Sequence, residues 1–182
     1  MAEEAAAAHS MTALPDELLL RVLGHVMLRW GRKKWCGAVR GVSRRWRALH
    51  DGTCTYLRVG NGVTDEVMHA LCAQLPALAH LNLFEVTSLT AEGLRAVGSL
   101  TTLTYLNLYN CNVTDAVLRE LRDLTELSKL YLYGCTLVTD VGLQHLTSLT
   151  ALTKLYLRGT STTQAGRNAL KAALPALTIS VQ

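Results

Sequence analysis

The sequence LSKLYLYGCTLVTDVGLQHL, residues 127–146, contains the pattern that determines the fold. Its first half has leucine at the first, fourth and sixth places, so apolar and variable residues alternate as in a strand with one buried side. Its second half contains Thr139, a good helix N-cap, followed by Asp140, whose negative charge suits the start of a helix. The stretch therefore predicts a short strand followed by a short helix.

The same pattern recurs along the chain at intervals of 24 or 25 residues. The motif L-x-x-L-x-L begins at Leu78, Leu103, Leu127 and Leu152. Cys54-x-x-Leu57-x-Val59 keeps the register one step earlier, and Leu177-x-Ile179-x-Val181 is a truncated last copy. The second halves repeat as Val63-Thr64-Asp65, Leu89-Thr90-Ala91, Val113-Thr114-Asp115, Val138-Thr139-Asp140 and Thr162-Thr163-Gln164. One such unit cannot bury its own apolar side, whereas stacked units can, so the sequence predicts a solenoid.

This unit resembles the cysteine-containing leucine-rich repeat, whose pattern is L-x-x-L-x-L-x-x-C-x-x-[VIL]-T-D-x-G-[LI]-x-x-L. Residues 127–146 match it almost throughout, and residues 103–121 match with Cys111, although Ala116-Val117 replaces x-Gly there. The resemblance implies an α/β array over residues 53–182, with about five units and a truncated last strand. It also implies parallel strands on the concave face of the array and helices on its convex face.

The five cysteines, at positions 36, 54, 72, 111 and 135, do not predict a metal site or a disulfide framework. No pair has the two-residue gap of a metal knuckle, and an odd number argues against complete pairing. We interpret Cys111 and Cys135 as small buried residues that fill the turn after a strand, where burial without an activating charge leaves a thiol inert. We therefore expect no metal and no cofactor.

Residues 12–50 differ from the repeats in both charge and pattern. They contain nine basic and two acidic residues, whereas residues 51–182 are nearly balanced. Apolar residues at helical spacing form a stripe from Leu18 to Val26. Because about 40 residues cannot build a self-sufficient core, this helical module should pack on a partner, on the repeat array, or on both.

Both ends of this module are similar to the F-box. The segment LPDELLLRVL, residues 14–23, is similar to its opening, L-P-x-E-[LI]-[LV]-x-x-[IV]-[LF], and VSRRWR, residues 42–47, to its closing V-[CS]-[KR]-x-W-[RK]. Residues 25–37 depart from the family pattern. The resemblance implies that the module docks on a Skp-type adaptor, and through it on a cullin ubiquitin ligase. The adaptor-binding residues that it implies are Leu14, Pro15, Leu18, Leu19, Val22 and Leu23.

The variable strand positions of the repeats predict a target-binding surface. Five of the six tyrosines lie at such positions, and the basic residues gather toward the C-terminus. The predicted target-binding residues are Tyr105, Tyr109, Lys129, Tyr131, Tyr133, Lys154, Tyr156 and Arg158. Tyrosine is enriched in recognition surfaces, so we expect a tyrosine-lined groove whose basic end suits an acidic or phosphorylated segment. The alternative is that these are ordinary solvated strand residues, with tyrosine present for its β propensity.

Other functional classes find less support in the sequence. It contains no P-loop, G-x-S-x-G or H-E-x-x-H motif, so we expect no catalysis. Three tryptophans among the basic residues 29–47 would suit nucleic acid, but Trp46 belongs to the F-box pattern, and we expect no nucleic-acid partner.

The N-terminus and the hydropathy of the chain bear on where the protein acts. Residues 1–11 are interpreted as a disordered leader, because they lack the basic start and apolar core of a secretory signal. The most apolar run is too short to cross a membrane, which favours the cytoplasm or nucleus. The leading interpretation is a substrate receptor of a Skp-cullin-F-box ligase, and the alternative is a free-standing repeat scaffold with a helical N-terminal cap.

Overall fold

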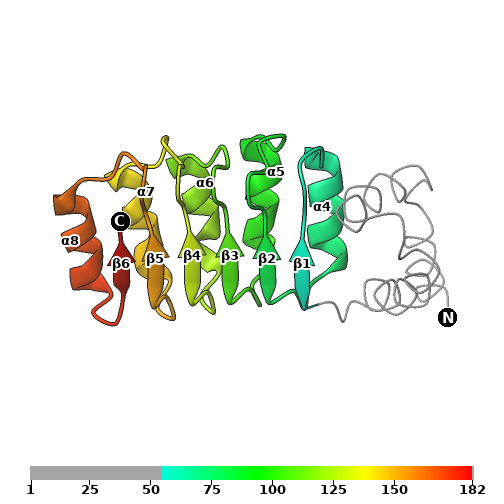
Figure 1. The fold of residues 1–182 in the computed structure, drawn as a ribbon. Coiled ribbons are helices and arrows are strands. Elements are labelled where there is room, and N and C mark those ends of the chain that lie inside the picture. The colour runs from blue at the N-terminus through cyan, green and yellow to red at the C-terminus, as the bar shows by residue number, and fades with distance from the viewer. Residues whose placement is uncertain (1–54, 182) are drawn as a thin grey trace, which may run out of the picture.

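The computed structural model describes residues 55–181, which form one parallel sheet covered on one side by helices (Figure 1). The predicted leader at residues 1–11 and the predicted helical module at residues 12–50 lie outside the described residues. The strands are β1 (Tyr56–Arg58), β2 (His80–Asn82), β3 (Tyr105–Asn107), β4 (Lys129–Tyr131), β5 (Lys154–Tyr156) and β6 (Thr178–Ser180). The α-helices are α4 (Asp65–Gln74), α5 (Ala91–Arg95), α6 (Asp115–Glu120), α7 (Asp140–His145) and α8 (Gln164–Ala173). Short 3₁₀ helices follow three of them, at Ala96–Ser99, Leu121–Asp123 and Leu146–Ser148.

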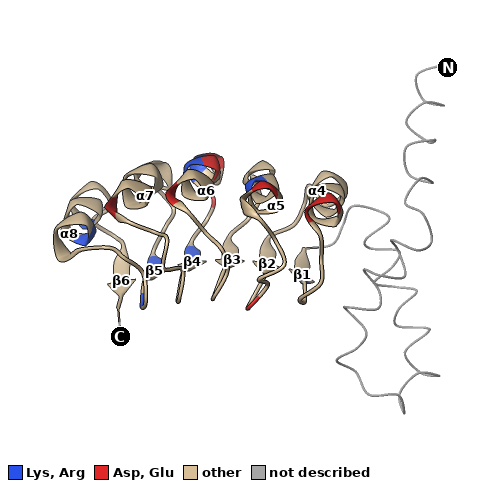
Figure 2. Cartoon of the chain, turned by 90° about the horizontal axis from the view of Figure 1, so that it is seen from above, with Lys and Arg blue, Asp and Glu red and all other residues tan. Residues whose placement is uncertain are grey.

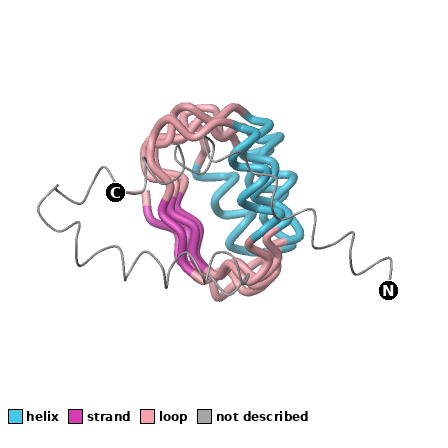
Figure 3. The backbone as a smooth tube through the Cα atoms, turned by 90° about the vertical axis from the view of Figure 1, so that its right-hand side faces the viewer, coloured by secondary structure: helices cyan, strands magenta, loops and turns pink. Residues whose placement is uncertain are grey.

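Each strand lies inside the leucine motif that predicts it. The six strands pair in sequence order, all parallel and in one register, so that equivalent residues of successive repeats are neighbours. Viewed along the array, the strands form one wall and the helices the opposite wall, joined by loops (Figure 3). This arrangement is the α/β solenoid that the repeat predicts.

The array curves, with the strands on the inner side of the arc (Figure 2). The cause is geometric, because neighbouring strands are about 4.8 Å apart whereas packed helices need about 8–10 Å between their axes. Stacking one strand and one helix per repeat therefore spreads the helix side more than the strand side. The predicted placement of strands on the concave face and helices on the convex face agrees with this curvature.

The core is a set of leucine rows that run through the array between the two walls. The central residue of each of the first five strands is buried, and Leu81, Leu106, Leu130 and Leu155 have no exposed surface. Burying a leucine completely stabilises the fold by about 1.5–3 kcal/mol. Because each leucine packs between its copies in the neighbouring repeats, that stabilisation exists only in the stacked array.

The helices begin where the sequence predicts, at the residue after a threonine. The hydroxyls of Thr90, Thr114, Thr139 and Thr163 each accept a hydrogen bond from a backbone N–H in the first turn of their helix. Thr64 occupies the same place before α4 without such a bond. These caps satisfy amides that would otherwise lack a partner at the helix start.

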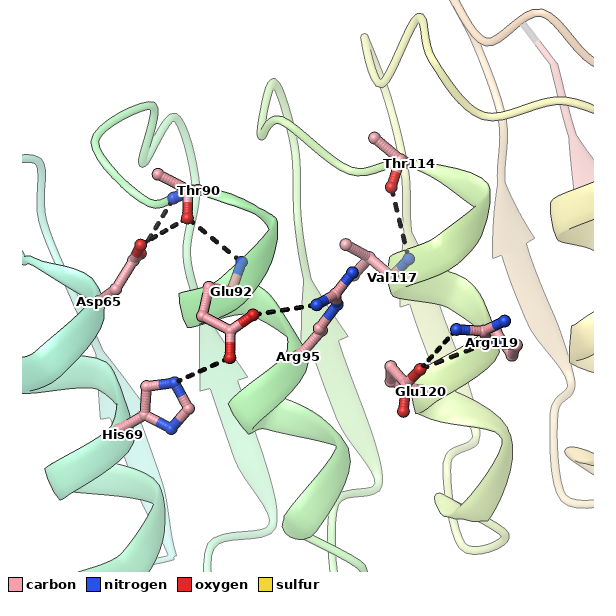
Figure 4. Close-up of polar contacts among 9 residues, drawn as sticks. All are labelled: Asp65, His69, Thr90, Glu92, Arg95, Thr114, Val117, Arg119 and Glu120. Atoms are coloured by element: carbon pink, nitrogen blue, oxygen red, sulfur yellow. Dashed lines mark hydrogen bonds and ion pairs between the residues drawn. The ribbon is translucent and has the colours of Figure 1, made fainter.

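Three aspartates at helix starts bind the threonine N-cap of the following repeat, as Figure 4 shows for Asp65 and Thr90. The backbone N–H and the hydroxyl of Thr139 donate to the two oxygens of Asp115, at 2.8 and 2.6 Å. The same pair of bonds links Thr90 to Asp65 and Thr163 to Asp140. Each aspartate thus acts on the following repeat as well as on its own helix.

The glycine of the T-D-x-G pattern makes room for these aspartates. A Cβ at Gly93, Gly142 or Gly166 would overlap the carboxylate of the aspartate in the preceding repeat. Ala91 stands where the second repeat would have its aspartate, and Val117 stands where the next repeat would have its glycine. The departure from x-Gly at Ala116-Val117 therefore has a physical reason, since no carboxylate occupies that space.

Within residues 55–181, no helix is long and apolar enough to cross a bilayer.

Candidate functional site

The outward residues of the strands form three rows across the concave side, which we call the sheet face. The first row is Tyr56, His80, Tyr105, Lys129, Lys154 and Thr178. The second row is Arg58, Asn82, Asn107, Tyr131, Tyr156 and Ser180. The third row, two residues further along each repeat, is Gly60, Phe84, Tyr109, Tyr133 and Arg158. All eight predicted target-binding residues lie in these rows.

Eight aromatic rings on the sheet face form a continuous chain of contacts, which we call the aromatic band. In order of contact, the rings are Tyr56, His80, Tyr105, Tyr131, Tyr156, Tyr133, Tyr109 and Phe84. Neighbouring ring centroids are between 4.2 and 6.4 Å apart. The band follows the first row from β1, crosses the second row at β4 and β5, and returns along the third row to the residue after β2.

Two pairs in this band are stacked nearly face to face. The rings of Tyr131 and Tyr156 have centroids 4.2 Å apart and an interplanar angle of 10°. Those of Phe84 and Tyr109 have centroids 4.5 Å apart and an angle of 17°. Burial and a hydrogen bond with Tyr156 raise the pKa of Tyr131 to about 12, so this phenol stays neutral at physiological pH. Tyr131, at the centre of the band, is therefore uncharged and contacts the rings of Tyr105 and Tyr156.

Two asparagines lie between the arms of the aromatic band with a defined orientation. Asn82 Oδ1 accepts a hydrogen bond from the backbone N–H of Phe84 at 3.0 Å, and Asn107 Oδ1 accepts one from Tyr109 at 3.0 Å. These bonds fix the turn after each strand and occupy the oxygen side of each amide. The remaining polar group of each side chain is its NH₂, a hydrogen-bond donor, and that of the half-buried Asn82 lies nearer the surface than that of the buried Asn107.

The charges of the described residues are divided between the two sides of the array. The sheet face carries four exposed cations, Arg58, Lys129, Lys154 and Arg158, and its three rows contain no acidic residue. The ion pairs within residues 55–181 are His69–Glu92, Arg95–Glu92, Arg119–Glu120 and Arg122–Asp123, all on the helix side. Figure 2 shows the basic positions of β4 and β5 on the sheet side and most acidic positions along the helices, with one acidic position on the loop after β2 on the sheet side. The three rows therefore carry a net positive charge, and the exposed acid Glu85 lies at their edge, next to Phe84.

The buried cysteines have the environment expected of packing residues. The thiol of Cys111 donates to the carbonyl of Leu83, and that of Cys135 donates to the carbonyl of Leu108. Burial raises the pKa of Cys111 to about 12 and that of Cys135 to about 11, so both thiols stay protonated and unreactive. In the part of the chain that the structure describes, no group of acidic, histidine or cysteine side chains is arranged to hold a metal ion.

Four aromatic or basic residues of the sheet face are not among the eight predicted target-binding residues. Tyr56 and Arg58 belong to β1, whose repeat begins with Cys54 in place of leucine, and its outward residues were not included in the prediction. His80 and Phe84 occupy variable strand positions and join the aromatic band, although they were not among the predicted target-binding residues. The alternation around Leu81 already places His80 and Phe84 at outward strand positions, and the same alternation around Leu57 was the signal that could have identified Tyr56 and Arg58. The six predicted adaptor-binding residues lie outside the described residues.

Solved structures with a similar fold include two internalins from Listeria monocytogenes. Internalin C2 from Listeria monocytogenes str. 4b F2365 matches with a TM-score of 0.55 and 24% sequence identity, over 69% of this chain and 50% of that chain. An internalin, inlF, from the same organism matches with a TM-score of 0.46 and 20% identity, over 60% of this chain and 36% of that one. This chain thus spans about half the length of internalin C2 and about a third of the length of inlF. No protein-family model and no curated protein matches the sequence. The likeness to internalin C2, with the parallel one-register sheet, shows that residues 55–181 have the leucine-rich-repeat fold.

Proposed function

We propose that this chain is the substrate-recognition subunit of a Skp-cullin-F-box ubiquitin ligase. In this proposal, residues 12–50 dock on a Skp-type adaptor and the sheet face of the repeats binds the target protein. The chain then performs no chemistry itself, because the ligase complex supplies it. Such a receptor works in the cytoplasm or nucleus and needs neither a cofactor nor contact with nucleic acid or a membrane.

The observation that carries the binding half of the proposal is the aromatic band. Eight rings in mutual contact line one side of the array, and Tyr56 and Phe84 are 54% and 37% exposed. Tyrosine provides apolar area and a hydroxyl while losing little rotamer freedom on binding. Rings that already pack on one another lose still less, so the free-energy cost of ordering this surface for a partner is small.

The ligase half of the proposal depends on the resemblance of residues 14–23 and 42–47 to the two ends of the F-box. Repeats follow this module directly, as the array begins near residue 53. A short helical module that cannot fold alone and a binding surface on the same chain suit a protein that links a target to an adaptor. The free-standing scaffold differs only in lacking the adaptor.

Affinity purification with two variants tests the two halves separately. The change Leu18→Asp with Val22→Asp should abolish recovery of a Skp-type adaptor and its cullin, because it places two unpaired charges in the docking face. The change Tyr131→Ala with Tyr156→Ala should abolish capture of the target and leave adaptor recovery unchanged. Mass spectrometry of the recovered proteins is the measurement, and each variant serves as the control for the other.

The outcomes separate the competing functions. If the wild-type chain recovers no adaptor and no cullin but retains a tyrosine-dependent partner, the chain is a free-standing scaffold. Target capture that survives the double tyrosine change would show that the aromatic band is not the binding surface.

A further inference from the structure

The charged residues in the three rows of the sheet face are all basic, and the acid Glu85 lies beside Phe84 at the edge of the face, away from β4 and β5. Arg58 lies at one end of the second row, and the other three cations surround the tyrosines of β4 and β5. Lys154 and Tyr156 belong to β5, and Arg158 follows two residues after the strand ends. A cation therefore lies on each side of the Tyr156 ring. None of the four cations forms an ion pair with another residue of the described range. A partner that neutralises them gains charge-assisted hydrogen bonds.

The polar groups between the rings are also donors. The Asn82 and Asn107 carboxamide oxygens accept hydrogen bonds from the turns that follow their strands, and the NH₂ group of the half-buried Asn82 can donate to a ligand. Asn107 is only 9% exposed, so its orientation is held by the surrounding strands. Donors in the middle and cations at both ends match a ligand rich in acceptors and negative charge.

The stacking of the rings distinguishes a peptide from a single-stranded nucleic acid. Proteins that bind single strands without sequence preference offer an open ring face on which each base stacks. Here the faces of Tyr131 and Tyr156 cover each other, as do those of Phe84 and Tyr109. Ring edges and hydroxyls are then the groups presented outward, and these suit the apolar side chains and carbonyls of an extended polypeptide.

We propose that the sheet face binds an extended acidic segment of a target protein, which lies across the strands with carboxylates at the Lys129, Lys154 and Arg158 end. This inference rests on the proposed function and specifies its ligand. A second carboxylate pairs with Arg58, and apolar side chains between the two acidic positions pack against the aromatic band.

The geometry of the sheet sets the spacing of the acidic residues. From Arg58 on β1 to the cations on β4 and β5 there are three or four strand intervals, about 14–19 Å at about 4.8 Å each. An extended chain covers that distance in about four to six residues. The preferred ligand therefore has acidic residues about four to six positions apart with apolar residues between them.

Fluorescence anisotropy with three labelled peptides tests the inference on the full chain. The acidic probe is two copies of Glu-Glu-Ser-Leu-Ser-Leu, and the matched probes replace each Glu with Gln or with Lys. At low salt the acidic peptide should bind about tenfold or more tightly than the Gln peptide, and the Lys peptide should not bind. High salt should remove most of that difference, because screening weakens exposed charge pairs.

Two charge-reversal variants locate the site. The change Lys154→Glu with Arg158→Glu should weaken binding of the acidic peptide about tenfold. The matched control, Arg119→Glu with Arg122→Glu, makes the same change in net charge on the helix side and should leave the affinity within about twofold. Circular dichroism confirms that both variants are folded.

Several results would overturn the inference. Equal binding of the acidic and Gln peptides would show that charge does not select the ligand, and equal loss in both charge variants would show that net charge alone is responsible. Displacement of the peptide by an oligothymidine of similar length at lower concentration would identify nucleic acid as the preferred ligand. None of these results affects adaptor recovery or tyrosine-dependent target capture, so the proposed function would stand or fall separately.

Discussion

At the scale of single residues, the pairing of aspartate with glycine shows how one repeat constrains the next. Asp65, Asp115 and Asp140 each face a glycine of the following repeat, whereas Ala91 is followed by Val117 at the glycine position of the next repeat. The carboxylate and a Cβ cannot occupy the same space, so the two positions must change together. The pattern T-D-x-G thus records a contact between two repeats, although it lies within a single repeat of the sequence.

Gly166 provides a test of this pairing, because the atoms nearest its added Cβ all belong to the Asp140 side chain. We expect Gly166→Ala to lower the free energy of unfolding by about 1–3 kcal/mol, the usual cost of overpacking. In an Asp140→Ala background the same change should instead raise it by up to about 1 kcal/mol, because alanine is the better helix former. Urea unfolding of the four proteins measures both effects. A penalty of the same size in both backgrounds would rule out the carboxylate as its cause.

The sequence predicts these glycines and aspartates as a family pattern but not the reason for them. The distance between Asp140 and Gly166 depends on how closely two helices stack, which a single repeat does not contain. Ala116-Val117 is an unexplained departure in the sequence and becomes a consequence of Ala91 only when the repeats are placed side by side. Contacts between neighbouring repeats can be identified only from the packed structure.

At the scale of the element, the hydrogen bonds between Asp140 of α7 and Thr163, the N-cap of α8, should weaken at acidic pH. Hydrogen bonds from the hydroxyl and then the backbone N–H of Thr163 lower the pKa of Asp140. Because the folded pKa is the lower one, this stabilisation is complete above the unfolded value of about 3.9 and is lost as pH falls through the folded pKa. We expect the difference in unfolding free energy between wild type and Asp140→Asn to be constant from about pH 7 to 5 and to shrink below about pH 4.

Urea unfolding at a series of pH values measures this difference. Asp123→Asn is the control, because it removes an exposed carboxylate whose ion pair is with its neighbour Arg122. A difference for Asp140→Asn that persists unchanged at pH 3 would contradict the assignment.

The positions of the elements were largely predictable, and their fine structure was not. Alternation about the leucines placed each strand, and the threonines marked the helix starts, because burial and capping depend on local sequence. The short 3₁₀ helices at residues 96–99, 121–123 and 146–148 were not predicted. They arise where the chain must turn back toward the next strand within a fixed number of residues, and that demand comes from the stacking of repeats.

At the scale of the whole molecule, the array should unfold as one unit. Leu130 lies at the centre of β4, is completely buried, and is in register with Leu106 and Leu155 in the neighbouring strands. We expect Leu130→Ala to lower the free energy of unfolding by about 2–5 kcal/mol. Lys129→Ala, on the outward side of the same strand, should change it by no more than about 0.5 kcal/mol. Denaturation followed by circular dichroism should show one transition that moves to lower urea, and two separate transitions would refute cooperative unfolding.

The candidate surface was predictable in its composition but not in its connections. Period-two alternation placed all eight predicted residues on the sheet face. The step of the aromatic band from Tyr105 to Tyr131, which changes rows, depends on side-chain rotamers and strand spacing. The orientation of Asn107 depends on the turn that follows β3. The Tyr105–Tyr131 contact and the orientation of Asn107 therefore could not be predicted from the sequence.

Because Ala91 replaces the aspartate, one boundary between repeats lacks the hydrogen bonds that the other three have. The carboxylate clamps that tie α4 to α5, α6 to α7 and α7 to α8 have no counterpart between α5 and α6. Because the bonds are missing there, we expect the array to bend more easily between α5 and α6 than at the other repeats, which would change the angle between β2 and β3. The rings of His80 and Tyr105 face each other across this boundary. A ligand that contacts the repeats on both sides of this boundary would therefore fix the curvature of the array.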